Sequence, residues 1–384
     1  MLRRPLGAVV THAERARWAD SVAHLFTFGE GDRSSIVPIA SFDLGQLPSA
    51  GLAYERSDAF VDGNALELRA ATWGPRWIDA SIADRYAIDE PDRVAARVAV
   101  HRTEDNLFVG LGPDATRATR SRFGLSRFAG GAGYRRQLGG GDWAGSWLDA
   151  EAGVRRVDFV HGVCCGDPSL DTRIARGEVM APPGYGDDYT AAYGRIELTL
   201  DARRPRPEPG SGGYVHLQAA PNVEPGATAD RRAWIAYGAV AGAALDLTGH
   251  RRTLELLVAV DAVDGLAGGA LPFTEYAELD GDVMAGFPPG WLAGRSTAAA
   301  QLGYTWPLWI GCDAHARVAV GNAFGAHLAG LAADKLRVSS DVGLTTSSER
   351  DRGFEVLIGL GTETFEQGAG ATSLRVMLGS KRGF

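Results

Sequence analysis

The sequence has few cysteines, and no recognisable metal-binding pattern surrounds them. Cys164 and Cys165 are adjacent, and the third cysteine is Cys312. The adjacent pair could form a strained vicinal disulfide, hold a metal or stay unpaired. No nearby group of Cys and His residues has the spacing of zinc ligands. We therefore favour unpaired thiols and expect no metal site.

Long apolar runs are also missing. No window of about 18 apolar residues occurs, which excludes a transmembrane helix. The best candidate, Ala233–Leu245, is short and rich in small residues, so it favours a strand. The N-terminus, Met1–Pro5, lacks the apolar core of a secretory signal. If the protein is exported, we expect this chain to be a mature or trimmed form.

Positive charge is too scarce for a protein that binds nucleic acid. The formal net charge is −8, and nearly all of the cations are Arg. A basic surface is what attracts nucleic acid, so we expect no such partner.

Glycine is abundant, with 51 residues and no collagen-like period. Each Gly inside a helix costs about 1 kcal/mol, so this composition favours strands and turns. From Ser35 onward apolar and polar residues alternate; in Arg93–His101, for example, Val and Ala residues alternate with Arg93, Arg97 and His101. Alternation gives each strand one apolar and one polar face. It fits both a soluble sandwich and a membrane barrel.

Three features favour the barrel. Many segments have about 9–12 residues, as a tilted membrane strand requires. Trp and Tyr gather near segment ends, as in interfacial girdles, and short connections alternate with long ones. We predict a 16-stranded antiparallel transmembrane β-barrel in an all-β fold, with strands near residues 35–43, 48–58, 63–73, 77–88, 92–102, 119–138, 142–161, 190–201, 211–222, 231–246, 250–263, 296–307, 313–323, 334–344, 352–361 and 372–383.

One connection, Leu271–Ser296, is too long and too rich in Gly and Pro for a hairpin turn. It joins the eleventh and twelfth predicted strands, and is the sixth outer loop if both chain ends face the periplasm. Loops of this size in compact domains are usually functional or disordered.

The same loop carries a family resemblance. Pro272-Phe273, the run Gly281–Phe287 and Gly294-Arg295-Ser296 resemble the inward-folded loop of bacterial surface-antigen barrels, the outer-membrane family of BamA, TamA and the two-partner-secretion transporters. The resemblance implies that the sixth outer loop folds into the barrel. Its predicted motif residues are Gly281, Met284, Ala285, Gly286, Phe287, Gly294 and Arg295.

The loop lacks the family's arginine. The family has an Arg-Gly-Phe or Arg-Gly-Tyr triplet whose Arg pairs with acids on the twelfth and thirteenth strands, whereas this chain has Ala285 there, and Gly303 and Ala319 at the acidic positions. Removing one member of a buried ion pair costs about 3–5 kcal/mol, but removing all members avoids that penalty. We expect Gly303 and Ala319 to face a loop held by packing of Phe287, Pro288, Pro289 and Trp291.

Other segments extend the resemblance over residues 35–384, most clearly over 265–323. Asp201, Arg203 and Gly210 match the family's Asp-x-Arg and Pro-x-Gly turn, and Phe108–Pro113 resembles its Phe/Tyr-x-Gly-x-Gly segment. The aromatic C-terminus, Phe384, is typical of such barrels.

Residues 1–33 differ from the barrel region 34–384. Trp18, Val22, Leu25 and Phe26 follow the spacing of an amphipathic helix. The segment is too short for the periplasmic POTRA domains common in the family. The helix could cap the periplasmic mouth, lie on the membrane or be the remnant of an upstream domain.

No enzymatic motif is present, and we expect no catalytic activity and no cofactor. A Ser–His segment and a Gly-x-Ser-x-Gly elbow are both missing, and we expect His101, His161, His216 and His315 to be isolated wall residues. A calcium site at Asp187-Asp188, near Asp171 and Glu178, lacks EF-hand spacing.

The resemblance implies a bacterial outer-membrane location and a role in protein insertion, protein translocation or lipid transport. A passive or structural plugged barrel is the alternative. Expected partners are outer-membrane lipids, including lipopolysaccharide, and a periplasmic partner or client protein.

Overall fold

The computed structural model describes residues 27–28, 33–89, 91–204, 210–225, 231–279, 281–309, 312–346 and 352–382. The predicted N-terminal helix, Pro209 of the turn motif and Phe384 lie outside these ranges.

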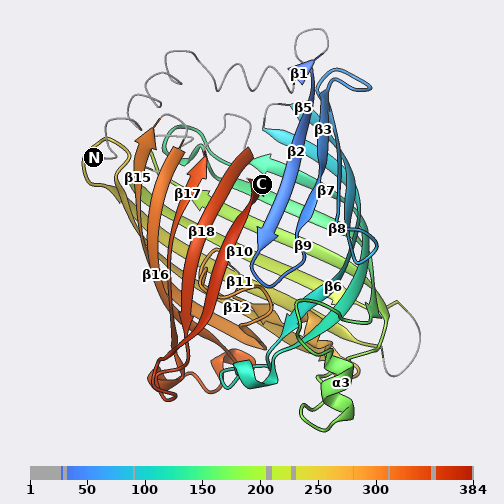
Figure 1. The fold of residues 1–384 in the computed structure, drawn as a ribbon. Helices are drawn as coiled ribbons and strands as arrows, with labels where there is room; N and C mark the ends of the chain where they lie inside the picture. The colour runs from blue at the N-terminus through green and yellow to red at the C-terminus, as the bar shows by residue number, and fades with distance from the viewer. Residues whose placement is uncertain are drawn as a thin grey trace.

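Sixteen long strands close into a ring (Figure 1). The sheet has seventeen strands, of which one is the two-residue β1 (Thr27–Phe28). In chain order the ring contains β2 (Ser34–Asp43), β3 (Ser49–Ser57), β4 (Asn64–Thr72), β5 (Trp77–Asp89), β6 (Asp92–Phe108), β7 (Ser121–Gln137), β8 (Trp147–Val160), β9 (Tyr189–Asp201), β10 (Gly212–Val223), β11 (Ala233–Asp246), β12 (Thr253–Ala267), β15 (Ser296–Trp309), β16 (Cys312–Phe324), β17 (Arg337–Thr346), β18 (Arg352–Thr362) and β19 (Ala371–Arg382). Each strand pairs antiparallel with the next, and β19 returns to β2. The predicted fold class is confirmed.

Alternation along each strand separates an apolar outer face from a polar lumen. On β18, Phe354, Ile358 and Leu360 are exposed, whereas Glu355 and Leu357 between them are buried. The same exposed apolar face recurs around the ring, at Leu52, Leu68, Ile82, Val98, Val154, Ile196, Leu217, Val258, Leu302, Val318, Val342 and Leu374. A continuous apolar exterior of this kind is what a membrane-spanning barrel presents to lipid. No helix among the described residues is long and apolar enough to span a bilayer.

The luminal wall is lined with paired charges. Arg85 Nη2 lies 2.6 Å from Glu67 Oε2, and Arg135 Nε lies 2.9 Å from Asp149 Oδ2. Glu67 is buried, and a buried charge is stable only when it is paired in this way. The pairs therefore account for the polar half of the alternating pattern.

The two ends of the barrel differ in their connections. Residues 109–120, 161–188, 268–295 and 325–336 form long loops at one end, and the loop 161–188 contains the short helix α3 (Leu170–Ala175). Figure 1 places α3 beyond the lower rim of the barrel. Outer-membrane barrels have long outer loops and short periplasmic turns, so we call the end with α3 the outer end and the opposite end the inner end.

The ring is weakest where its first and last strands meet. Among the described residues, three of β19, Met377–Gly379, are in register with Ser41–Asp43 of β2, and the Leu44 N–H donates to the Val376 carbonyl at 2.9 Å just beyond them. The neighbouring pair β18 and β19 is in register from Arg352 to Thr362. At the inner end, β1 pairs with Ser34 and Ser35 of β2 instead. We call the β2–β19 junction the seam.

Candidate functional site: the plug loop and its seat

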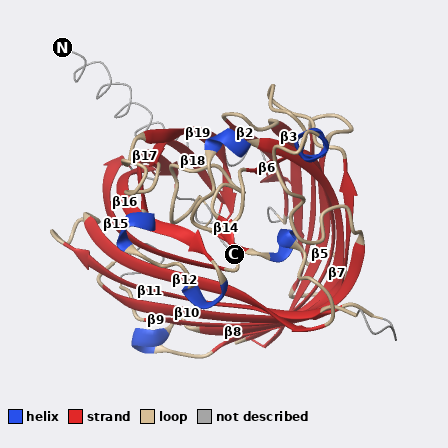
Figure 2. Cartoon of the chain, turned by 90° about the horizontal axis from the view of Figure 1, so that it is seen from below, coloured by secondary structure: helices blue, strands red, loops and turns tan. Residues whose placement is uncertain are grey.

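The loop between β12 and β15, residues 268–295, enters the barrel, and we call it the plug loop. The two-residue strands β13 (Ala277–Glu278) and β14 (Ala293–Gly294) pair with each other inside it, and the backbone N–H of Leu279 donates to the Leu292 carbonyl at 3.0 Å. Figure 2 shows β14 within the ring of strands. This hairpin presents residues 281–292 to the wall.

The tip of the plug loop lies flat on the β17–β18 wall. The Gly286 backbone N–H donates to Ser339 Oγ at 2.8 Å. Glycines on both sides permit this approach: a Cβ at Gly286 would collide with the Leu360 carbonyl, and one at Gly359 would lie 2.8 Å from the Ala285 carbonyl oxygen. Gly286 is therefore a steric requirement of the seat.

Apolar side chains fill the space between the tip and the lumen wall. Met284 is fully buried, and Phe287 and Trp291 are each 1% exposed. They share one cluster with Leu107 of β6 and Ala319 of β16. Burying a large apolar side chain stabilises by about 1.5–3 kcal/mol, so packing alone gives the tip substantial affinity for its seat.

Two polar wall residues bind backbone carbonyls of the tip. Gln301 Nε2 on β15 donates to the Asp282 and Val283 carbonyls at 3.0 and 2.8 Å. Arg375 Nη1 on β19 makes a long hydrogen bond, 3.5 Å, to the Phe287 carbonyl. The tip is therefore attached to strands on both sides of its β17–β18 seat.

The start of the plug loop is held by an ion pair on the far wall. Glu275, within the 3-10 turn η4 (Phe273–Glu275), accepts hydrogen bonds from Arg155 on β8 and Tyr189 on β9, and Trp234 Nε1 on β11 donates to it at 3.2 Å. Arg155 Nη2 also donates to Asn222 at 2.9 Å. The loop therefore has an ionic attachment, made by residues unrelated to the missing triplet arginine.

Aromatic packing reinforces this attachment. The Phe273 ring lies 5.8 Å from Phe108, 5.1 Å from Phe123 and 6.1 Å from Phe159, measured between ring centroids. Pairs at such distances contribute about 0.5–1.5 kcal/mol beyond burial. Burial also raises the pKa of the Tyr276 phenol, next to this cluster.

The end of the plug loop returns to the rim through Arg295. Its Nε donates to the Val263 carbonyl at 2.9 Å, and its Nη2 lies 3.4 Å from Asp264 Oδ1. A Cβ at Gly294 would lie 2.5 Å from the Phe324 carbonyl oxygen, so this position also requires glycine.

The two predicted wall positions differ in their surroundings. Ala319 lies in the cluster with Met284 and Phe287. Gly303 is on the same face as Gln301, but among the described residues the only atom within 4 Å of a Cβ built on it is Cγ of Arg317. Gln301, two residues closer to the outer end, contacts the plug loop instead.

The turn motif lies at the inner end, away from the plug. Arg203 Nη2 lies 3.1 Å from Asp201 Oδ2, its backbone N–H donates to Asp201 at 2.9 Å, and its guanidinium stacks 4.1 Å above the Tyr214 ring. Gly210 is buried two residues before β10 begins. The motif therefore fixes the connection between β9 and β10 rather than building a binding site.

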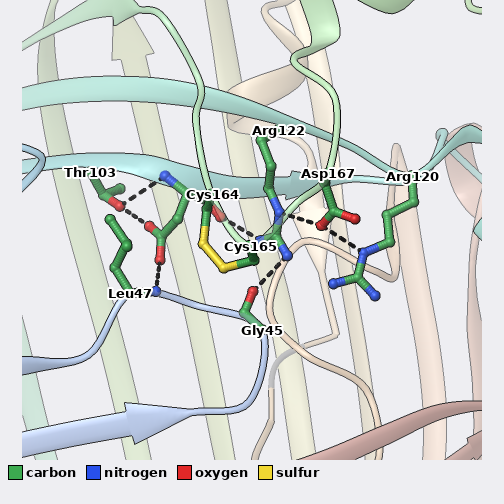
Figure 3. The surroundings of a disulfide bond; sticks show 9 residues. Gly45, Leu47, Thr103, Arg120, Arg122, Cys164, Cys165 and Asp167 are labelled. Atoms are coloured by element: carbon green, nitrogen blue, oxygen red, sulfur yellow. Dashed lines mark hydrogen bonds and ion pairs between the residues drawn. A yellow bond between two sulfur atoms is a disulfide. The ribbon is translucent and has the colours of Figure 1, made fainter.

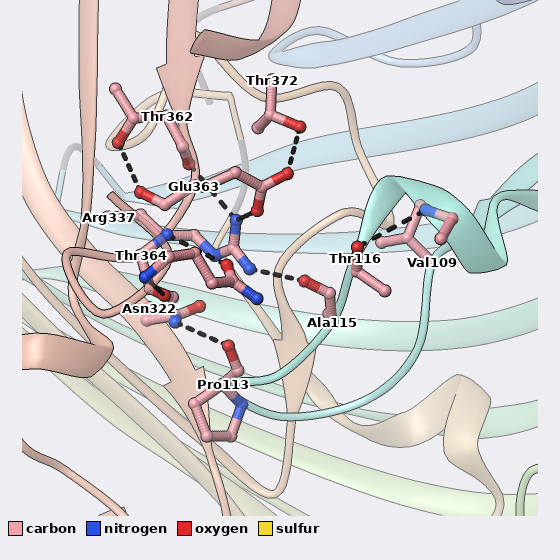
Figure 4. A network of polar contacts seen from close by, with 12 residues as sticks. Val109, Pro113, Ala115, Thr116, Asn322, Arg337, Thr362, Glu363, Thr364 and Thr372 are labelled. Carbon is pink, nitrogen blue, oxygen red and sulfur yellow. Dashed lines mark hydrogen bonds and ion pairs between the residues drawn. The ribbon is translucent and has the colours of Figure 1, made fainter. Parts of the chain in front are cut away.

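Buried arginines bind the outer loops to one another. Arg337, which is fully buried, donates to the Ala115 carbonyl of the loop 109–120, to the Thr362 carbonyl at 3.2 Å and to Glu363 at 2.9 Å (Figure 4). Lys335 Nζ lies 2.8 Å from Asp114. The loops after β6, β16 and β18 are thus connected to one another at the outer end of the barrel.

A second buried arginine connects the first and fourth outer loops, 44–48 and 161–188. Arg122 Nε lies 2.8 Å from Asp167, while its two Nη atoms donate to the Asp105 and Gly45 carbonyls at 2.7 and 2.6 Å (Figure 3). Cys164 and Cys165 form a disulfide beside this arginine, so the prediction of unpaired thiols there is wrong. Adjacency in the sequence was the signal for this pairing.

The histidine predictions need correction. His315 Nε2 lies 3.4 Å from Asp341 and 3.7 Å from Glu355, both of which also face Arg317. His161 Nδ1 lies 3.2 Å from Asp171. Neither residue is isolated, because strand register and loop folding bring carboxylates close to it.

The carboxylates considered for calcium point to different partners. Asp188 accepts from the Phe159 backbone N–H at 2.7 Å, Asp171 accepts from the Tyr185 hydroxyl at 2.7 Å, and Glu178 pairs with Arg173 at 2.8 Å. Within the described ranges no group of three or more His, Cys, Asp or Glu residues could hold a metal ion.

Several residues that hold the plug loop were missed by sequence reasoning: Arg155, Glu275, Gln301, Ser339, Gly359 and Arg375. Alternation puts the strand residues on the luminal face. It does not reveal which of them lie at the height of the plug loop.

The fold is shared with known barrels. BamA from Haemophilus ducreyi, in a form lacking POTRA domains 1–3, matches 91% of this chain and 70% of its own with a TM-score of 0.64 and 10% sequence identity. The CdiB proteins of Acinetobacter baumannii and Escherichia coli match 91% and 90% of the chain at a TM-score of 0.55 each, with 8% and 11% identity, and the chain spans 59% and 62% of their lengths.

Sequence comparison alone finds no relative: no family model matches the chain, and no curated protein is significantly similar to it. The structural likeness therefore carries the assignment. With sixteen antiparallel strands closed into a ring, the chain has the barrel fold of BamA and the CdiB proteins, which its sequence motifs predicted.

Proposed function

We propose that this chain is a bacterial outer-membrane barrel that inserts or translocates client protein by opening at its seam. The observation that carries the proposal is the short β2–β19 ladder, Ser41–Asp43 with Met377–Gly379, in a ring whose other junctions are longer. A strand edge with few partners is a template for adding another strand. The role is non-enzymatic.

The chemistry of β2 supports a weak seam. The Ser57 N–H donates to the Arg33 carbonyl, so the odd-numbered residues of β2 bond to β3 and the even-numbered residues face the seam. Pro38 is one of the even-numbered residues and has no N–H to donate. Proline in a sheet is tolerated mainly at edges, and Pro38 lies three residues inward of Ser41, where the ladder to β19 ends.

The proposed lipid and protein partners follow from the apolar exterior of the barrel and from the edge of β2. The apolar exterior fits outer-membrane lipid, including lipopolysaccharide. Between Ser35 and Ser41 the edge of β2 is in register with neither β1 nor β19 among the described residues, and this stretch fits an extended segment of a periplasmic client or partner protein.

A disulfide across the seam tests the proposal. A Cβ at Gly379 would lie 3.6 Å from Ser41 Cβ, within the 3.5–4.5 Å range of disulfides. We expect purified Ser41→Cys/Gly379→Cys protein in liposomes to insert a small test barrel only after reduction, with the native chain, with and without reductant, as the control. Equal insertion by the oxidised and reduced forms would contradict the proposal.

A passive plugged barrel is the second candidate, favoured by the closed outer loops. Arg337 and Lys335 join three of these loops above a plug that is itself attached to the wall. On this alternative the native chain gives almost no conductance in planar bilayers. The Ser41→Cys/Gly379→Cys protein then inserts no client, whether its seam disulfide is oxidised or reduced.

A further inference from the structure

We infer that Arg375 is a positioning residue that couples the plug loop to the seam, so that the two move together. Arg375 belongs to β19. Its guanidinium contacts β2 through Asp43 and the plug tip through Phe287.

The contact with β2 is an ion pair. Arg375 Nε donates to Asp43 Oδ2 at 2.7 Å, and both side chains are 8% exposed. Asp43 is also the last residue of the short seam ladder, where it is in register with Met377. Hydrogen bonds between charged groups are shorter and stronger than neutral ones, so this pair supplements a ladder that has few backbone bonds.

The contact with the plug uses the other end of the same group. Arg375 Nη1 donates to the Phe287 carbonyl at 3.5 Å and lies over Gly281, where a Cβ atom would collide with it. Gly281 therefore leaves room for the guanidinium. The cation that the loop lacks at Ala285 is provided here by the wall.

The geometry makes the two contacts interdependent. If β19 separates from β2, Arg375 moves away from Asp43, and its Nη1 cannot keep its place between Gly281 and Phe287. Arg375 bonds Asp43 through Oδ2, and Oδ1 has no hydrogen-bond partner among the described residues, so separation would remove the cation from a buried carboxylate, which is unfavourable. Seam opening and plug displacement are therefore one event in the native chain.

Planar-bilayer conductance, with and without the seam disulfide, tests this coupling. All proteins carry Ser41→Cys, Gly379→Cys and Cys312→Ser. With the native Arg375 we expect the oxidised seam to suppress openings of the plugged lumen. With Arg375→Gln we expect openings roughly tenfold more frequent, the effect of losing one hydrogen bond to a charged group, and independent of the seam disulfide.

Two further variants separate the contacts. Arg375→Lys keeps a charge for Asp43 but cannot reach Phe287 at the same time. We therefore expect the seam disulfide to form at the same rate as with the native Arg375, whereas channel openings should no longer depend on that disulfide. Gly281→Ala displaces the guanidinium from the loop without altering it and should give the same uncoupling. Both keep the inference testable if Arg375→Gln fails to fold.

Arg317→Gln is the matched control, because Arg317 is also a wall arginine paired with a buried acid, Asp341, at 2.8 Å. Openings that still depend on the seam disulfide in all three test variants would overturn the inference. So would the same uncoupling in Arg317→Gln, since the effect would then reflect general loss of stability. The purified chain is measured without a client, so the result is independent of insertion activity.

Discussion

The ring of Phe287 rests on Gly361. A Cβ atom at Gly361 would lie 2.6 Å from two of the ring carbons, so the wall of β18 has room for the plug tip only while this position is glycine.

We expect Gly361→Ala to loosen the plug. Overpacking a filled core costs about 1–3 kcal/mol, and here the added methyl group can be accommodated only by moving Phe287. Conductance in planar bilayers should show more frequent openings than in the native chain. Gly130→Ala is the control, because its Cβ would meet only ordinary contacts, the nearest being Val98 Cγ2 at 3.8 Å. Equal conductance of the two variants would contradict the proposed seat.

Glu275→Gln should weaken the start of the plug loop while preserving its shape. The variant leaves Arg155 without its carboxylate, and losing one partner of a buried polar pair costs about 1–3 kcal/mol. Urea unfolding in detergent measures the loss. The double variant Arg155→Gln/Glu275→Gln should recover part of it, as expected of residues in direct contact; simple additivity would show that the two residues do not interact.

Arg122→Lys should release the outer loops. Lysine cannot replace a fork that reaches Asp167 and two carbonyl groups at once. We expect faster tryptic cleavage after Arg173 and Arg176 in the loop 161–188.

Arg156→Lys is the control, because Arg156 forms an exposed pair with Asp158. It should change the free energy of unfolding by less than about 0.5 kcal/mol and leave cleavage unchanged. Unaltered cleavage in Arg122→Lys would mean that the loops are held elsewhere.

Pro38→Thr should strengthen the seam. Threonine restores an N–H facing β19, and one added hydrogen bond contributes about 0.5–1.5 kcal/mol. Hydrogen exchange should report slower exchange near Ala40, and client insertion should slow if the seam is the route. Faster insertion would contradict a strand-edge mechanism.

Much of the barrel could be predicted because lipid on one side and water on the other impose alternation on every strand. The segment predicted at 352–361 is observed as Arg352–Thr362. Errors occur where local turns replace extended chain: the strand predicted from residue 142 begins at Trp147, since Gly141–Trp143 form a 3-10 turn, and the one predicted from 334 begins at Arg337 after a similar turn, Ala333–Lys335.

The contacts of the plug loop could not be predicted in the same way. Arg155 and Glu275 are 120 positions apart, and Arg375 and Asp43 are 332 apart. Periodicity assigns each of them a face, but their meeting depends on strand register around the whole ring. The loop motif, by contrast, was visible through its resemblance to the inward-folded loop of a known family. The structure adds the reason for its glycines: Gly281, Gly286 and Gly294 leave room for Arg375, Leu360 and Phe324 of the wall.

Arginine supplies nearly all of the positive charge in the barrel wall, and a guanidinium keeps its proton at any pH that a folded protein tolerates. Pairs such as Arg85–Glu67 and Arg135–Asp149 therefore depend on a cation whose charge is fixed. Substitutions that remove the carboxylates would leave the interior cationic, and repulsion between the remaining guanidinium groups would favour separation of the strands.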